Sequence, residues 1–286
     1  MCLQISPYIK VQGKVTYGGK RKKMAGGYNG KHFVFIHGAG GGAWVWYKVK
    51  PRLEAVGHRV TVLDMAASGM HPKTFKEVHT FNEYNEPLMK FMAVLQENEK
   101  VILVGHSLGG MNLALAMEKY PDKISVAVFA TAIVPDTSHQ PSYIFEKMYE
   151  TAPEGAEVDN QVSWEESTDG PITWVHFGPK FLASMIYDLS PIEDLELGKI
   201  LYRPGSFFLP DLSKAKKLSN ESYGSVKKVY ILCKNDKIIR EEFQRWIIQY
   251  SRVQDVVEIK DSDHMPMASQ PQEFCKHLIA IGLKYV

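Results

Sequence analysis

The sequence predicts an α/β fold, a mostly parallel and doubly wound sheet with an inserted, mainly helical cap. Three observations lead to this prediction. Short runs of β-favouring apolar residues alternate with segments of helical periodicity, which is the pattern of βαβ units. A serine flanked by glycines stands between one such run and the helix that follows it. The alternation stops at residues 135–210, where prolines and aromatic residues are frequent.

The composition is that of a globular protein and argues against several other classes. The chain has 286 residues, of which 45% are hydrophobic and 23% charged, and its net charge is +2. We therefore expect no nucleic-acid partner, and no apolar run approaches the roughly 20 residues of a membrane helix. The three cysteines are far apart and odd in number, so we expect reduced residues of a cytoplasmic protein and no disulfide framework.

Residues 1–30 differ from the rest of the chain. They are basic and rich in glycine, and no acidic residue occurs before Glu54. Because they have neither helical nor strand periodicity, we expect a disordered extension. A plastid-targeting segment is the alternative, although the Ser and Arg richness of such segments is missing. Met24 could equally be the natural start of the protein.

Six strands are expected on the two sides of residues 135–210. They cover residues 33–36, 59–64, 101–104, 125–130, 228–233 and 255–259. Helices are expected between them, at 46–55, 80–95, 111–117, 240–250 and 272–283. The core of the fold is therefore assigned to residues 31–134 and 211–286.

Residues 135–210 are expected to form the cap, with short helices at 179–189 and 192–201. Pockets lie at the carboxyl ends of open parallel sheets, and the aromatic residues of this segment suit the wall of such a pocket. An irregular helical layer that only packs against the core is the alternative.

Ser107 is the candidate nucleophile. It lies in the pattern G-x-S-x-G, between a predicted strand and a predicted helix, which is the context of a nucleophile elbow. The turn is so sharp that a Cβ at Gly105 or Gly109 would collide with the strand or the helix. The hydroxyl is then exposed at the positive end of the helix. A glycine turn with an incidental serine is the alternative.

A serine hydroxyl needs a base to take its proton and a third group to orient that base. His264 follows the last predicted strand and is the candidate base. Asp236 follows the strand before it and is the candidate orienting acid, which gives the chain order Ser, acid, His. Asp211, Asp261 and Asp263 also lie in predicted loops, but the last two are too near the histidine in the chain to occupy a separate loop.

A glycine-rich loop at residues 37–44 follows the first predicted strand. It has neither a G-x-G-x-x-G pattern nor the G-K-[ST] ending of a phosphate loop. In hydrolases with a nucleophile elbow, this loop and the residue after the nucleophile each give one backbone N–H to the oxyanion hole. Ala39 and Leu108 are therefore the candidate donors, and a merely flexible loop is the alternative. No group of His, Cys, Asp and Glu shows metal-ligand spacing.

The chain resembles the plant methylesterase family of α/β-hydrolases, which includes the salicylate-binding methyl salicylate esterase, polyneuridine aldehyde esterase and hydroxynitrile lyases. The resemblance rests on KHFVFIHGAGGGAWVWYK (31–48), SGMHP (68–72), VILVGHSLGGMNLALAMEKYPDKISVAVF (101–129), RPGSFF (203–208) and DHMPM (263–267). It implies hydrolysis of a small carboxylic methyl ester without a cofactor, commonly by a homodimer. Ser107, Asp236 and His264 match the triad of that family, and Ala39 and Leu108 match its oxyanion hole.

The candidate residues of the substrate pocket come partly from this resemblance and partly from the aromatic residues of the cap segment. The candidates are Gly38, Ile133, Tyr149, Trp174, Phe177 and Met265. Lyases of the family carry threonine at the position of Gly38 and lysine at that of Met265, so the two residues favour an esterase. Hydroxynitrile lyase and a non-hydrolytic small-ligand binding protein or receptor are the alternatives.

The identity of the ester stays open at this level. Glu157, Val162 and Ile133 stand where the salicylate-type member has aromatic pocket residues, so the pocket is expected to be looser and less aromatic. Methyl esters of salicylate, jasmonate, indole acetate or an alkaloid are comparable candidates.

Overall fold

The protein is described by a computed structural model that covers residues 30–151, 158–165 and 171–285. The extension expected at residues 1–30 lies outside this part of the chain, except for Gly30. Glu157, for which we expect a place in the pocket, also lies outside it.

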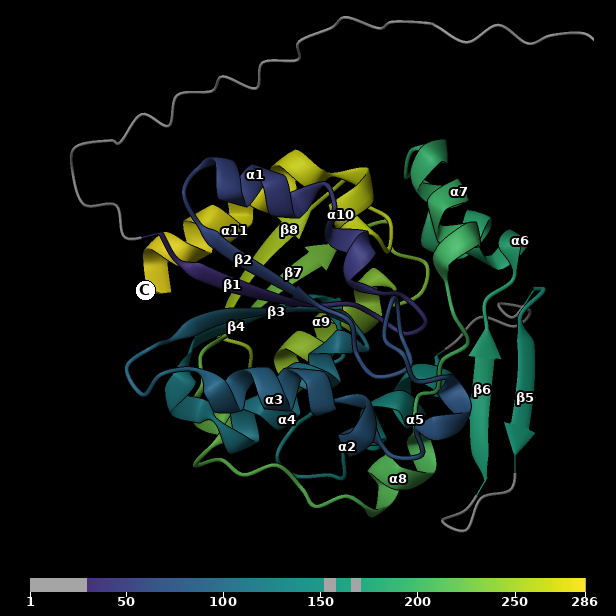
Figure 1. The fold of residues 1–286 in the computed structure, drawn as a ribbon, viewed down its shortest axis with the longest axis horizontal. Coiled ribbons are helices and arrows are strands. Elements are labelled where there is room, and N and C mark those ends of the chain that lie inside the picture. Colours follow the sequence, from purple (N-terminus) through teal and green to yellow (C-terminus); the bar gives the residue numbers. More distant parts are fainter. Residues whose placement is uncertain (1–29, 152–157, 166–170, 286) are drawn as a thin grey trace, which may run out of the picture.

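A six-stranded parallel sheet forms the centre of the fold (Figure 1). Its strands are ordered β2-β1-β3-β4-β7-β8, which is the doubly wound arrangement expected from the sequence. Their bounds are β1 His32–Ile36, β2 Arg59–Leu63, β3 Val101–Ser107, β4 Ile124–Ala132, β7 Lys228–Cys233 and β8 Asp255–Ile259. Each lies at or within three residues of its predicted position.

Helices cover both faces of the sheet because successive residues of each strand point to opposite faces. Phe33 and Phe35 of β1 pack with α1 (Val49–Ala55) and α11 (Pro271–Tyr285) in one apolar cluster. Val34 and Ile36 belong to a second cluster, with α3 (Glu86–Val94), α4 (Gly109–Lys119) and α9 (Glu241–Tyr250). Figure 1 shows α1 and α11 above the sheet and α3 and α4 below it. The four inner strands β1, β3, β4 and β7 are buried on both faces along nearly their whole length, as in other parallel sheets, whereas the edge strands β2 and β8 are partly exposed.

Short elements complete the core. They are η1 Ala43–Trp46, η2 Phe75–Glu77, α2 Phe81–Tyr84, η3 Pro121–Lys123, α8 Leu209–Lys214, η5 Tyr223–Ser225 and α10 Pro266–Ser269. The helix predicted over 80–95 is divided into α2 and α3. Pro87 stands in the first turn of α3, where its missing N–H costs nothing, and it could not have continued the preceding helix.

The segment between β4 and α8 lies beside the carboxyl ends of the strands (Figure 1). Its elements are α5 Tyr143–Glu150, β5 Gln161–Glu165, β6 Ile172–His176, α6 Pro179–Phe181, the π-helical turn η4 Leu182–Ile186, and α7 Ile192–Leu201. The sequence analysis expected helices here and did not anticipate the antiparallel pair of β5 and β6.

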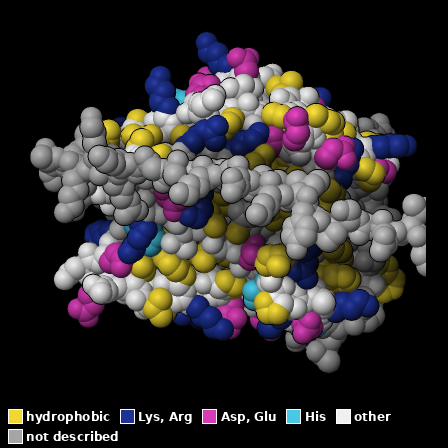
Figure 2. Space-filling model, turned by 45° about the horizontal axis from the view of Figure 1, so that its top comes forward, with side chains coloured by type: hydrophobic (Ala, Val, Ile, Leu, Met, Phe, Trp, Pro, Cys, Tyr) yellow, Lys and Arg dark blue, Asp and Glu magenta, His cyan; other side chains and the backbone are white. Residues whose placement is uncertain are grey.

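The surface carries charges of both signs. On the face shown in Figure 2, acidic and basic side chains are interspersed and form no single-sign patch. Among the described residues, no helix combines the length and the apolar character needed to cross a bilayer. Cys233 and Cys275 are both buried, free thiols.

Candidate active site

Ser107 ends β3 and begins the turn into α4. Its φ is 53°, in the left-handed region that non-glycine residues rarely adopt. A Cβ on Gly105 would lie 2.7 Å from the carbonyl oxygen of Gly109, and a Cβ on Gly109 would lie 2.8 Å from that of His37. Both glycines are therefore required by close packing, as the sequence analysis argued. The turn presents the hydroxyl of Ser107 to the cavity described below.

His264 and Asp236 come together although 28 residues separate them in the chain. His264 Nδ1 lies 2.7 Å from Asp236 Oδ2, and both side chains are buried. Because a carboxylate only accepts, Nδ1 carries the proton and donates it to the hydrogen bond. The other ring nitrogen, Nε2, is then left as a proton acceptor.

The carboxylate of Asp236 is held on both of its oxygens. Oδ1 accepts from the backbone N–H groups of Ile238 and Ile239, at 2.7 and 3.0 Å. Oδ2 accepts from the hydroxyl of Thr131 in addition to the ring of His264. Four donors thus fix the acid, and Thr131 is a site residue that the sequence analysis missed.

Two of the other acids considered from the sequence are engaged elsewhere, and the third, Asp261, is exposed. Asp263 is buried, and it accepts from the N–H groups of Leu189 and Met265 and from the hydroxyl of Ser190. Burial raises the pKa of its carboxyl. Asp211 accepts from the N–H of Phe81. Among the described residues, Asp236 is the carboxylate that contacts the ring of His264.

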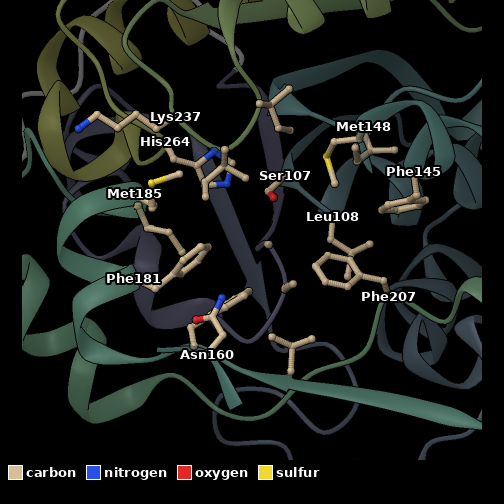
Figure 3. A pocket seen from close by; sticks show the side chains of 18 of the residues that line it. Ser107, Leu108, Phe145, Met148, Asn160, Phe181, Met185, Phe207, Lys237 and His264 are labelled. Atoms are coloured by element: carbon tan, nitrogen blue, oxygen red, sulfur yellow. The ribbon is translucent and has the colours of Figure 1, made fainter. Parts of the chain in front are cut away.

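Ser107 and His264 line one cavity of about 440 Å³. Figure 3 shows the hydroxyl of Ser107 and the ring of His264 directed into the same space. Within the described residues no hydrogen bond joins the two side chains. Such bonds are often long or poorly aligned before a substrate is bound.

Ala39 and Leu108 also line the cavity, on the two sides of the serine turn. Neither backbone N–H donates a hydrogen bond to another described residue. A pair of unpaired amides beside a nucleophile is the arrangement that stabilises a developing oxyanion. The assignment of Ala39 and Leu108 as oxyanion donors stays a prediction.

Two further histidines support the site. His106 Nε2 donates to the carbonyl oxygen of His264 at 2.7 Å. Burial, and next the nearby ring of His264, lower the pKa of His106 well below its usual value, so the ring is neutral. His37 Nδ1 donates to the carbonyl oxygen of Gly38 at 2.7 Å, and its Nε2 accepts from the N–H of Met65. The two rings thus hold the backbone at His264 and at the glycine-rich loop.

The cavity has two walls of different character. The core wall is formed by loops that follow the strands, and consists of Gly38, Ala39, His106, Ser107, Leu108, Ile133, Ile238 and His264. The cap wall is largely apolar, and consists of Phe145, Met148, Tyr149, Thr151, Asn160, Val162, Val175, Phe177, Phe181, Met185, Ile186, Tyr202 and Phe207. A mostly apolar pocket with a few fixed polar groups suits a small organic ligand.

Cations stand at the rim of this cavity. Lys237 Nζ pairs with Asp188 at 2.6 Å and donates to the carbonyl oxygen of Ser184 at 3.2 Å. Arg240 donates to the carbonyl oxygen of Thr151. Figure 3 shows the amine of Lys237 pointing away from Ser107. These charges therefore connect the core to the cap and do not enter the centre of the cavity.

Four of the six predicted pocket residues line the cavity, namely Gly38, Ile133, Tyr149 and Phe177. The other two do not. Trp174 is buried against Phe75, with ring centroids 4.7 Å apart, because its strand neighbour Val175 takes the cavity face. Met265 is buried in the core, where its sulfur accepts from the hydroxyl of Tyr202 at 3.9 Å. Their assignment to the pocket wall is corrected accordingly.

The described residues include no group of three or more His, Cys, Asp or Glu side chains that could hold a metal ion.

Comparison with known proteins decides the family. Residues 33–277 match the profile of the alpha/beta hydrolase family. The chain belongs to the α/β-hydrolase family. Within this family it is 52% identical to salicylic acid-binding protein 2 of Nicotiana tabacum, over 90% of this chain and 98% of that one. It is 50% identical to methylesterase 1 of Arabidopsis thaliana, over 90% and 97%.

Solved structures of α/β-hydrolases have the same fold as this chain. The crystal structure of polyneuridine aldehyde esterase superposes with a TM-score of 0.86 at 50% identity, covering 88% of this chain and 99% of that one. The predicted fold class and the resemblance to plant methylesterases are confirmed by these matches.

Proposed function

We propose that the protein is a carboxylic methyl-ester hydrolase that acts on a small plant hormone or alkaloid ester through a Ser-His-Asp triad. The observation that carries this proposal is that Ser107 and His264 line one largely apolar cavity, and that His264 is oriented by a hydrogen bond to Asp236. The names of the relatives support the same reaction, since they include esterases and a methylesterase.

The first half of the reaction is transfer of the acyl group to the enzyme. Ser107 Oγ attacks the ester carbonyl carbon while His264 Nε2 takes the hydroxyl proton. The carbonyl oxygen becomes an oxyanion that accepts from the N–H groups of Ala39 and Leu108. The C–O bond to the methoxy group then breaks, His264 returns the proton to it, and methanol leaves.

The second half regenerates the serine. Water gives a proton to His264 Nε2 and attacks the acyl carbon. The Ser107 ester bond breaks, the proton returns to Oγ, and the carboxylic acid is released. Asp236 keeps its proton-free form throughout, and it both orients the imidazole and stabilises the imidazolium. Ester and water are consumed, and acid and methanol are formed.

Charge placement favours hydrolysis over cyanohydrin cleavage. A lyase of this family is expected to hold the departing cyanide with a lysine next to the catalytic histidine, and here that position is Met265. Lys237 is engaged by Asp188 and by a backbone carbonyl. Non-hydrolytic binding of the acid in the same cavity is the remaining alternative.

Methanol release from a panel of methyl esters tests the proposal. The panel contains the methyl esters of salicylate, jasmonate and indole acetate and an alkaloid β-keto ester, with mandelonitrile included to detect cyanide release. The wild type should hydrolyse at least one ester, and Ser107→Ala should lower its kcat by at least about 10³-fold. Tight binding of an acid without turnover of any ester, or full turnover by Ser107→Ala, would overturn it.

Three finer assignments are part of the same proposal. The family resemblance supports a homodimer, which light scattering of the purified chain can test. The absence of a predicted disulfide framework supports a cytoplasmic location, which a fluorescent fusion can test. The cap is taken as residues 135–210, inserted between the core segments 31–134 and 211–286, and limited proteolysis can test these boundaries.

A further inference from the structure

The cap wall contains one side-chain amide among mostly apolar neighbours. Asn160 lines the cavity, directly before β5, and it lies beside Phe181 in Figure 3. Neither the triad nor the oxyanion hole uses it. The family motifs do not include it either.

The orientation of this amide is fixed by its partner. Asn160 Oδ1 accepts from the backbone N–H of Gly178 at 3.0 Å. An N–H can only donate, so the atom that faces Gly178 must be the oxygen, and Nδ2 must point the other way. Figure 3 shows this nitrogen turned toward the open centre of the cavity. Among the described residues, Nδ2 has no hydrogen-bond partner.

The backbone around the amide is closely packed. The carboxylate of the preceding residue, Asp159, accepts from the N–H groups of Lys180 and Phe181, each at 2.9 Å. A Cβ on Gly178 would lie 2.2 Å from Asp159 Cγ, so this approach requires glycine. The start of β5 is thereby joined to the start of α6, and the amide is held in place before any ligand arrives.

A donor held in an apolar wall discriminates between ligands. When an apolar acyl group fills the cavity and excludes water, the N–H of Nδ2 loses its hydrogen-bond partner, which is costly. An acyl group with an oxygen at that point restores the bond. Sites built to bond a polar group reject analogues that lack it more strongly than apolar pockets reject a change of size.

We infer that Asn160 is a specificity-determining residue, and that the preferred substrates are methyl esters whose acyl part carries a second oxygen acceptor, such as a ketone, remote from the ester. This inference rests on the proposed esterase function, since it names the substrate class of the same site. Ser107 and His264 act on the ester, while Asn160 Nδ2 donates to the second oxygen.

A ladder of synthetic esters tests the inference. Methyl oxo-octanoates with the ketone at successive carbons are compared with methyl octanoate, which has no ketone. We expect one ketone position to raise kcat/KM about threefold to tenfold over methyl octanoate, the range of one neutral hydrogen bond. In Asn160→Leu this ratio should fall to about one. A wild type without preference at any ketone position, or an unchanged ratio in Asn160→Leu, would contradict the inference.

Two further variants separate hydrogen bonding from shape. Asn160→Asp keeps an oxygen for the N–H of Gly178 but turns the cavity-facing atom from donor to acceptor. The preference for the ketone should be lost, and an ester with a hydroxyl at the same carbon should be favoured instead. Gln161→Leu removes an exposed amide from the next position of the chain, and it should leave the ketone ratio unchanged.

Binding measurements test the inference independently of the proposed function. In a Ser107→Ala background the esters stay intact, so their dissociation constants can be measured by calorimetry with and without Asn160→Leu. If the wild type hydrolyses no ester, the proposed function fails, and the ketone preference in binding still decides for or against Asn160. Equal weakening of the ketone and ketone-free esters by Asn160→Leu would overturn the inference alone.

Discussion

The core wall of the cavity carries its polar atoms on loops that follow parallel strands, whereas the cap wall presents mostly apolar side chains from short helices and a hairpin. In the core wall the candidate acid and base are held by hydrogen bonds, since Asp236 accepts from two backbone amides, a hydroxyl and the imidazole of His264. In the cap wall, Phe145, Met148 and Phe181 define shape. Under the proposed function, this difference places the reaction in the core wall and the choice of substrate in the cap wall.

The largest effect is expected in the core wall, from Asp236→Asn. An amide can present a donor to His264 Nδ1, which stabilises the wrong tautomer, so kcat should fall about 10³- to 10⁴-fold. Methanol release measures it. Asp261→Asn is the matched control, because this exposed aspartate lies in the same loop as His264, and its kcat should stay within about twofold of the wild type. A comparable fall in kcat in both variants would contradict the assignment of Asp236 as the orienting acid.

A change far from both walls should alter stability and leave the reaction intact. His32 lies at the start of β1, and burial, with Arg59 second, lowers its pKa to about 4. Above pH 6.5 the native and unfolded states both hold a neutral ring. As the pH falls from 6.5 to 4, the unfolded chain takes up a proton that the native ring does not, so the free energy of unfolding decreases by up to about 3 kcal/mol.

Urea unfolding of wild type and His32→Gln at pH 7 and pH 4 checks this prediction. The variant should lose less stability on acidification, and its kcat at pH 7 should equal that of the wild type. Parallel pH dependence of the two proteins would contradict it.

The hydrogen bond from Thr131 to Asp236 is a third feature of the core wall that can be tested. It donates to Asp236 Oδ2, so Thr131→Ala should lower kcat about tenfold, the range expected for one hydrogen bond to a charged group. Thr131→Ser keeps the hydroxyl and should recover most of the activity. A serine variant as impaired as the alanine variant would show that the methyl group, and not the hydrogen bond, matters.

The smallest effect is expected in the cap wall, from Phe181→Ala. This ring is stacked on Phe177 with centroids 5.3 Å apart, and it contributes apolar surface to the acyl pocket. Its loss should raise KM about threefold to tenfold and lower kcat by less than that. Phe181→Leu retains most of the volume and should be intermediate. A fall in kcat with unchanged KM would contradict the assignment of substrate choice to the cap.

The site could be predicted from the sequence where the backbone geometry restricts which residues can occur. The strained turn at Ser107 needs glycines on both sides, and this need is visible as G-x-S-x-G. Because the carboxyl ends of parallel strands share one edge, residues after separate strands are brought together. This reasoning placed His264 and Asp236 in contact without any knowledge of distances.

The cap was less predictable because no such constraint acts on it. Its helices and strands are too short to show a clear hydrophobic periodicity. An error of one residue in the register of a strand also places its side chains on the wrong face. Trp174 was chosen for its aromatic ring, yet the cavity face of β6 belongs to Val175. Thr131 and Asn160 act through single hydrogen bonds that only the folded chain defines.

The hydrogen bond from His106 to the carbonyl of His264 has a consequence for how such a protein diversifies. His106, the neighbour of Ser107, donates to the backbone of His264 from β3, so the relative position of these two residues is set mainly within the sheet, while Asp263 adds hydrogen bonds to Leu189 and Ser190 of the covering segment. We expect exchange of the apolar side chains around the cavity to change which acid such a protein releases while this alignment is kept.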